Sequence, residues 1–177
     1  LGGGEPSLLI TQLTATHSQR DVVVGTLRRL TGDRVPFAGG TSCGGVMTER
    51  GFHRNPAGGG TALGMWAVRG GEGCAFGVGG ASVVPSPRDA GREATRRAVQ
   101  ALDGSPADLL YVINAVGTEE AVLEGVRDAC GSKMPPLVGG ASGGPAPYNF
   151  LSDEPLRGAG DVVVVMAFCT PDEAIPV

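Results

Sequence analysis

The sequence has few of the residues that build metal sites. Its two histidines, His17 and His53, are far apart, and its four cysteines stand singly, without any C-x-x-C pair. Structural zinc sites need cysteine and histidine ligands clustered at short spacings. One histidine precedes a helical pattern and the other lies in a polar stretch, so we interpret both as solvated or capping residues. We therefore predict no metal and no cofactor.

The single cysteines also argue against a disulfide framework. Cys74 and Cys169 lie in apolar, strand-like runs and Cys130 ends a helical pattern, so we interpret these three as reduced, buried or half-buried side chains. This predicts an intracellular, reducing compartment, with the cytoplasm favoured and an organelle left open. Only Cys43, within the loop sequence TSCGG, is placed where a thiol could react.

Long apolar runs, clustered basic charge and a phosphate-binding loop are also missing. The longest apolar run, Val162 to Cys169, is far shorter than the roughly 20 residues of a membrane-spanning helix. The net charge is -4 and the arginines are dispersed, so no nucleic-acid partner is expected. No Gly-Lys-Ser/Thr sequence occurs, which excludes a nucleotide P-loop. We expect a soluble chain without a membrane span.

Glycine, in contrast, is abundant, with 31 residues, and one glycine-rich sequence occurs twice. VPFAGGTS at 35–42 returns as PPLVGGAS at 135–142, and the apolar runs at 61–68 and 161–168 are likewise one hundred residues apart. A β-rich run and a helical pattern precede each copy. This spacing predicts an internal duplication of a βαββ-like unit.

Three helices are predicted from apolar spacing and capping residues. The first runs over 19–30, between an N-cap at Ser18 and a stop at Gly32, and the second begins after an N-cap at Ser86 and runs to about Leu102. The third covers 118–130. The apolar face of the first helix consists of Val23, Val24, Leu27 and Leu30, and the small face of the second consists of Ala90, Ala94, Ala98 and Ala101.

β-rich runs predict strands on either side of these helices. The segment 61–68 is expected to form a hairpin with 74–84 across a glycine-rich connection, and Tyr148 and Phe150 are assigned to a polar loop. The segment 55–60 is read as a turn, and Pro145 and Pro147 forbid a helix directly after the second glycine pair. The predicted strands are 8–13, 35–38, 61–68, 74–84, 108–113, 136–138 and 161–168.

Together these elements predict a single α/β domain, with mixed sheets and packed helices, over residues 7–170. Its pseudo-repeats cover 7–69 and 107–169. Residues 1–6 resemble a linker, and 171–177 resemble a linker to a further C-terminal part.

The order of these segments resembles the N-terminal FIST domain. The resemblance is carried by VPFAGGTSCGG at 35–45, PRDAGREA at 87–94 and PLVGGAS at 136–142, and it covers about 7–170. One departure is Cys43-Gly44, where the family more often has Ala-Gly followed by an acidic residue. The resemblance implies a sensory or scaffolding module of signalling proteins that binds small ligands and is followed by a C-terminal FIST half. Some bacterial relatives are haem-dependent sensors, but neither histidine here is placed as an axial ligand.

The two glycine pairs are the candidate binding site. A strand that ends in Gly-Gly can turn sharply and direct backbone N–H groups at one point, which favours a small anion such as a carboxylate or phosphate. The alternative is that these glycines only permit tight turns and close packing. The candidate ligand-binding residues are Gly39, Gly40, Thr41, Ser42, Cys43, Gly139, Gly140, Ala141 and Ser142.

Three functional classes remain open. Small-ligand sensing and protein docking within a larger signalling or assembly protein stand close together, and a purely structural scaffold is the alternative. A thiol enzyme with Cys43 as nucleophile and His17 or His53 as base would need a proximity that the sequence does not establish. The acidic pairs Glu119-Glu120, at a helix start, and Asp153-Glu154, in a polar loop, are interpreted as structural. We predict a non-catalytic protein.

Overall fold

The computed structural model describes residues 4–15, 19–32, 34–42, 45–49, 51–54, 61–143, 148–152 and 162–171. Within these ranges the first half of the chain forms β1 (Leu8–Thr14), α1 (Arg20–Thr31), β2 (Phe37–Ser42), β3 (Gly45–Thr48), β4 (Gly51–Arg54) and β5 (Leu63–Val68). The second half forms β6 (Ala75–Ser82), α2 (Pro87–Gln100), β7 (Leu109–Ala115), α3 (Glu119–Cys130), the 3-10 turn η1 (Gly131–Lys133), β8 (Leu137–Ser142), β9 (Asn149–Leu151) and β10 (Val162–Cys169).

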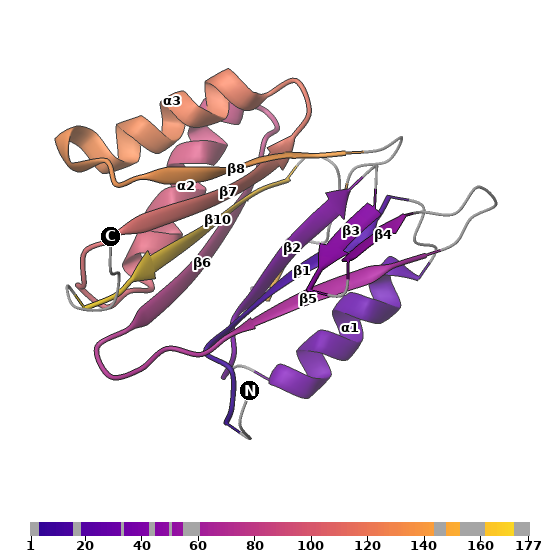
Figure 1. Ribbon diagram of the computed structural model, residues 1–177. Helices are drawn as coiled ribbons and strands as arrows, with labels where there is room; N and C mark the ends of the chain where they lie inside the picture. Colours follow the sequence, from indigo (N-terminus) through magenta and orange to yellow (C-terminus); the bar gives the residue numbers. More distant parts are fainter. Residues whose placement is uncertain are drawn as a thin grey trace.

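Two four-stranded sheets form the centre of the fold (Figure 1). The first sheet has the order β5-β1-β2-β9, and the second has the order β6-β10-β7-β8. Each contains one parallel pair, β1 with β2 and β7 with β8, among antiparallel neighbours. The predicted mixed α/β fold is therefore confirmed.

The predicted hairpin between the fifth and sixth strands is wrong. β5 pairs with β1 in the first sheet, whereas β6 pairs with β10 in the second, so residues 69–74 carry the chain from one sheet to the other. β10 is almost wholly buried on both faces and needs a neighbour along its full length, which β6 provides. This long-range pairing overrides the local turn signal.

Side chains alternate along the strands between three layers of core. In β10, Val162, Val164 and Met166 face the first sheet, while Val163, Val165 and Ala167 face α2 and α3. The two sheets thus pack on each other through one apolar layer. A third cluster, built around Leu13, Leu27 and Phe37, joins α1 to the outer face of the first sheet. The molecule is a stack of α1, two sheets, and the α2/α3 pair, as Figure 1 shows.

Helix α2 begins as the sequence predicts. Ser86 is the N-cap, its hydroxyl accepts a hydrogen bond from the Asp89 backbone N–H at 3.2 Å, and Pro87 occupies the first turn. The alanine face is buried at Ala90, Ala94 and Ala98. Ala101 does not belong to that face, because the helix ends at Gln100 and Ala101 is its exposed C-cap.

Helix α1 departs from the predicted pattern at its N-cap and along its apolar face. Ser18 lies outside the described residues, and Gln19 stands at the N-cap without a side-chain capping bond. Leu27 is buried as expected, but Leu30 is 71% exposed. The buried face continues instead to Thr31, four residues after Leu27, whose hydroxyl donates to the Leu27 carbonyl at 2.9 Å. Gly32 ends the helix, as predicted.

The two parts of the chain show the same strand order. Leu9 of β1 lies between Phe37 and Ala67, and Leu110 of β7 lies between Leu137 and Ala167. These registers agree with the hundred-residue spacing of the sequence and support the predicted duplication. The duplication itself stays a prediction, as do the domain boundaries.

Three strands were not predicted from the sequence. The short β3-β4 hairpin pairs Met47 with Phe52, and β9 adds to the edge of β2. Phe150 was assigned to a polar loop, but in β9 it is buried against Phe37. None of the helices in the described ranges is long and apolar enough to cross a membrane.

Candidate functional site

Both glycine pairs lie inside strands, which corrects the expectation that they form turns after strands. Gly39 and Gly40 are in the middle of β2, paired with Thr11 and Gln12 of β1. Gly139 and Gly140 hold the same place in β8. The backbone N–H groups of an extended strand point alternately to its two sides, so neither pair forms the predicted nest.

The two glycine-containing strands nevertheless meet at their carboxyl ends. The backbone N–H of Gly143, just after β8, donates to the Thr41 carbonyl of β2 at 2.9 Å. The Thr41 hydroxyl donates to the Gly143 carbonyl at 3.1 Å and accepts from the Tyr148 N–H at 3.0 Å. Thr41 is almost fully buried. These bonds join the first sheet to the second at the place where the sequence repeats.

A cavity of about 230 Å³ lies between the sheets beside this joint, and we call it the intersheet cavity. Two neighbouring strands of each sheet contribute to its wall. None of the described lining residues is charged. The lining residues are Gln12, Gly40, Thr41, Tyr111, Ile113, Gly139, Gly140, Ala141 and Ser142.

The glycines along the cavity differ in what the fold requires of them. A Cβ on Gly40 would lie 2.6 Å from Asn149 Oδ1 and 3.0 Å from Ile113 Cγ2, so the facing side chains exclude one. Gly139 has a φ of 144°, and a Cβ there would also collide with the carbonyl of Val112. A Cβ on Gly140 would have no atom within 4 Å. The packing therefore demands glycine at positions 40 and 139 but leaves position 140 open.

The polar groups around the cavity have different hydrogen-bonding states. The Ser142 hydroxyl donates to the Asn114 carbonyl at 3.1 Å, so its donor is already in use. Asn149 is fully buried and its Nδ2 donates to the Val162 carbonyl at 2.6 Å. Its Oδ1, which lies against Gly40, has no hydrogen-bond partner among the described residues. An unpaired acceptor therefore lies next to the cavity wall.

Six of the nine candidate residues predicted from the sequence line the cavity: Gly40, Thr41, Gly139, Gly140, Ala141 and Ser142. Gly39 instead faces Phe150 on the α1 side of the sheet. Ser42 lies at the end of β2, where its carbonyl accepts from the Ala15 N–H. Cys43 lies outside the described residues.

Sequence reasoning missed Gln12, Tyr111 and Ile113. A signal for them was available, because Tyr111 and Ile113 are two residues apart in an alternating strand and so share one face. Gln12 has the longest polar side chain of its strand, and it pairs directly with Gly40. The sequence does not show which strands pair, and this pairing is what brings Gln12 to the same cavity as Tyr111 and Ile113.

The described residues give little support to metal or thiol chemistry. They contain no group of three or more potential metal-binding side chains. Cys74, Cys130 and Cys169 are free thiols, buried or half-buried as predicted, and burial raises the pKa of the Cys130 thiol. Of the thiol site considered from the sequence, Cys43 and His17 lie outside the described ranges, whereas His53, the alternative base, lies in β4.

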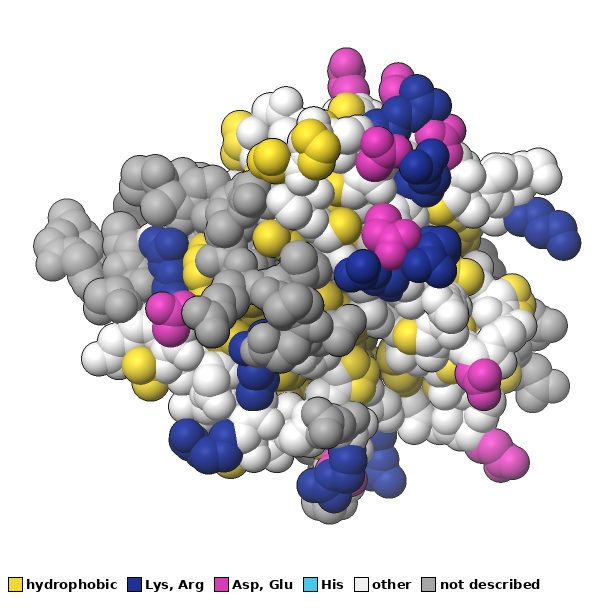
Figure 2. Space-filling view, turned by 180° about the vertical axis from the view of Figure 1, so that it is seen from behind, with side chains coloured by type: hydrophobic (Ala, Val, Ile, Leu, Met, Phe, Trp, Pro, Cys, Tyr) yellow, Lys and Arg dark blue, Asp and Glu magenta, His cyan; other side chains and the backbone are white. Residues whose placement is uncertain are grey.

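Charged side chains are balanced on the helical face. Figure 2 shows acidic and basic groups interspersed over the region of α2 and α3, without a basic stripe. Arg88 pairs with Asp128 at 2.7 Å, and Glu93 pairs with Arg96 at 2.9 Å and with Arg97 at 2.8 Å. Each of these three arginines is therefore paired with an acidic side chain. The predicted helix start at Glu119 and Glu120 is also confirmed.

Comparison with known proteins identifies the family. A family model, the FIST N domain, matches residues 7–175 of the 177-residue chain. A search of curated proteins finds no match. The matched range includes both glycine-containing strands, the joint between them and every residue of the intersheet cavity. The chain therefore belongs to the FIST N domain family, a family of sensory modules in signal transduction.

Proposed function

We propose that this protein is a non-catalytic sensory module that binds a small ligand in the intersheet cavity. The observation that carries the proposal is Gly140. Glycine in a strand interior is costly, since it loses more conformational freedom on folding than other residues and packs no side chain. Neither positive φ nor a close neighbour requires it at this position. The absence of a side chain at Gly140 keeps space open in the cavity.

The wall suggests the chemistry of the ligand. Gln12, Tyr111 and the exposed strand backbone offer hydrogen-bonding groups, while Ile113 and Ala141 offer apolar contact. An anion, as expected from the sequence, would have no described cation to pair with there, and unpaired buried charge is costly. We therefore favour a small, uncharged, polar ligand.

Signal transmission would follow from the position of the cavity. Its wall includes Thr41, which joins the carboxyl ends of β2 and β8. A ligand that contacts strands of both sheets changes the free energy of that joint, and only such a differential interaction shifts a conformational equilibrium. Family membership supports the sensory role, and a reducing intracellular location fits the free thiols.

Gly140→Val tests the ligand-binding proposal. The probes are a panel of small neutral amides and polyols, screened by ligand-observed NMR. We expect saturable binding to the parent protein and its loss in the variant, because the valine side chain would fill the cavity. The variant should remain folded by circular dichroism and thermal melting. Val138→Ala, on the same strand but outside the cavity wall, is the matched control and should bind normally.

Two outcomes would contradict the proposal. One is a folded Gly140→Val protein that binds the same probes with unchanged affinity. The other is a panel in which no compound binds the parent protein saturably. Either result would mean that the glycines of β2 and β8 serve only the packing of the strands.

Protein docking is the second candidate, favoured by the exposed edge of β8. β8 is the last strand of its sheet, and residues 138–141 are exposed. The outward backbone groups of such an edge can pair with a strand from another protein. Val138→Lys would place a charge on this edge without entering the cavity. Loss of a retained partner in this variant, with probe binding intact, would favour docking over sensing.

A further inference from the structure

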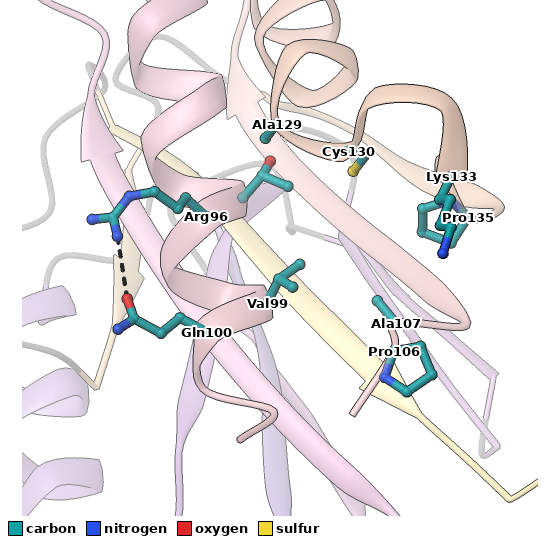
Figure 3. A pocket seen from close by; sticks show the side chains of 10 residues that line it. Arg96, Val99, Gln100, Pro106, Ala107, Ala129, Cys130, Lys133 and Pro135 are labelled. Atoms are coloured by element: carbon teal, nitrogen blue, oxygen red, sulfur yellow. Dashed lines mark hydrogen bonds between the residues drawn. The ribbon is translucent and has the colours of Figure 1, made fainter. Parts of the chain in front are cut away.

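A second hollow lies at the carboxyl-terminal ends of α2 and α3, on the opposite side of the second sheet from the intersheet cavity (Figure 3). We call it the helix-end groove. Its volume of about 490 Å³ is within the range of small-molecule sites. Residues from both helices and from the segments before β7 and β8 form its walls. Those that carry the argument are Thr95, Val99, Ala107, Ala129, Cys130 and Lys133.

The walls of the helix-end groove are mostly apolar, and the buried Thr95 hydroxyl among them already forms a hydrogen bond. Val99, Ala107 and Cys130 pack against the core between the helices and the second sheet. The Thr95 hydroxyl donates to the Gly91 carbonyl at 2.8 Å. Burial raises the pKa of the Cys130 thiol, so this side chain is uncharged at neutral pH. The groove therefore suits the apolar body of a ligand.

One cation remains available at the rim. Lys133 is the single lysine of the chain, it is exposed, and it forms no ion pair with any residue that the structure describes. Arg96 also borders the groove, but Figure 3 shows its guanidinium turned away toward Gln100, and it pairs with Glu93. Lys133 is thus the charge that a ligand in the groove would meet.

Four acidic groups of the two helices pair with arginines. Glu93 pairs with Arg96 and Arg97, and Arg88 pairs with both Asp128 and Glu124. None of the three acidic side chains among them, Glu93, Glu124 and Asp128, forms an ion pair with Lys133. The combination of an apolar hollow and one unpaired ammonium group is complementary to an amphipathic anion.

We propose that the helix-end groove binds a small monocarboxylate with an apolar body. The apolar body lies on Val99, Ala107 and Cys130, and the carboxylate accepts hydrogen bonds from the Lys133 ammonium group. This site is separate from the intersheet cavity, so it does not depend on the function proposed above.

Octanoate, octanol and octylamine are the probes that test this proposal, in calorimetric titrations of the full chain. We expect octanoate to bind best and octylamine worst, and each CH₂ removed from octanoate to weaken binding about fourfold where that group is buried. Lys133→Gln should weaken octanoate binding by about two- to fivefold, as for an exposed ion pair, and leave octanol binding unchanged. Arg127→Gln, an equal loss of charge on α3 outside the groove, is the matched control and should have no effect.

Occupancy is tested by filling the groove. Ala129 is exposed, so Ala129→Trp should fold normally and block octanoate. Octanoate should also protect Lys133 from acetylation by an activated ester, read out by mass spectrometry. The proposal is overturned if octanoate fails to bind the parent chain at millimolar concentration, or binds Ala129→Trp equally well. It is also overturned if the parent chain self-associates in sedimentation and Ala129→Trp abolishes this, because a second copy would then occupy the groove.

Discussion

Single residues at the joint between the sheets tie α1 to the second half of the chain. Tyr148 donates a hydrogen bond from its hydroxyl to Asp21 Oδ1 at 2.9 Å, and the Arg20 guanidinium lies over its ring. Its backbone N–H donates to the Thr41 hydroxyl. One residue therefore connects the first turn of α1 with β2 and the start of β9.

The ionisation of Tyr148 gives a prediction at this scale. Burial, and then the hydrogen bond to Asp21, raises the pKa of its phenol from 10.0 to about 12. Because the neutral form is favoured in the folded state, the contribution to stability is fully present below pH 10 and is lost as the pH rises toward 12. An ultraviolet titration should show a phenolate transition near pH 12, and Tyr148→Phe should remove it. A Tyr148→Phe protein that keeps this transition would contradict the assignment.

Glycine positions, as well as apolar side chains, determine how closely helix α2 packs on the second sheet. In β6, Gly77 and Gly79 face α2, and a Cβ on either would collide with a backbone carbonyl of that helix, at Ala98 or Ala94. The glycines of the strand and the alanines of the helix thus allow a close approach. The small face of α2 follows from its alanine spacing, whereas the glycines of β6 that complete it are identified only by the packing.

Gly79→Val tests this close packing. The added side chain should push α2 away from the second sheet and lower the free energy of unfolding by about 1–3 kcal/mol, the usual cost of overpacking. Gly25→Ala is the control, because α1 leaves open space at that position and alanine favours helix by roughly 1 kcal/mol. Chemical denaturation of both variants measures the difference. Equal stability of Gly79→Val and the parent would show that the helix does not pack this closely.

The whole molecule is a stack of four layers in which two sheets share one apolar interface. At one end that interface gives way to the intersheet cavity, beside the hydrogen bonds of Thr41 with Gly143 and Tyr148. The cavity therefore lies where packing between the sheets is replaced by a few polar contacts. We expect a substitution at this end to alter how the two sheets pack on each other more than a substitution within the apolar layer.

Thr41→Val tests the joint. It removes the hydroxyl that bonds Gly143 and Tyr148, leaves the Tyr148 N–H without its partner, and should cost about 1–3 kcal/mol. Amide hydrogen exchange should accelerate at Gly143 and Tyr148. Thr31→Val is the control, since the Thr31 hydroxyl is bonded only within α1 and its own neighbour Gly32. Unchanged exchange in Thr41→Val would mean that other contacts hold the sheets together.

The sequence by itself determined the helices and most strands of this protein, because capping residues and apolar spacing act within a few neighbouring positions. Ser86 and Gly32 mark helix boundaries, and the hundred-residue repeat indicates two similar strand arrangements. Its local signals also misassigned the β5–β6 connection and the glycine pairs, since hairpins and turns can be formed locally but strand pairing is decided across the chain.

Only the tertiary structure decided which residues share the intersheet cavity. Gln12, Gly40, Tyr111 and Gly140 come from four strands of two sheets, and nothing in their sequence positions links them. Their proximity follows from the pairing registers and from the bonds that Thr41 makes across the sheets. The physical reason is that local spacing fixes which face of a strand a side chain occupies, whereas packing between sheets fixes what that face meets.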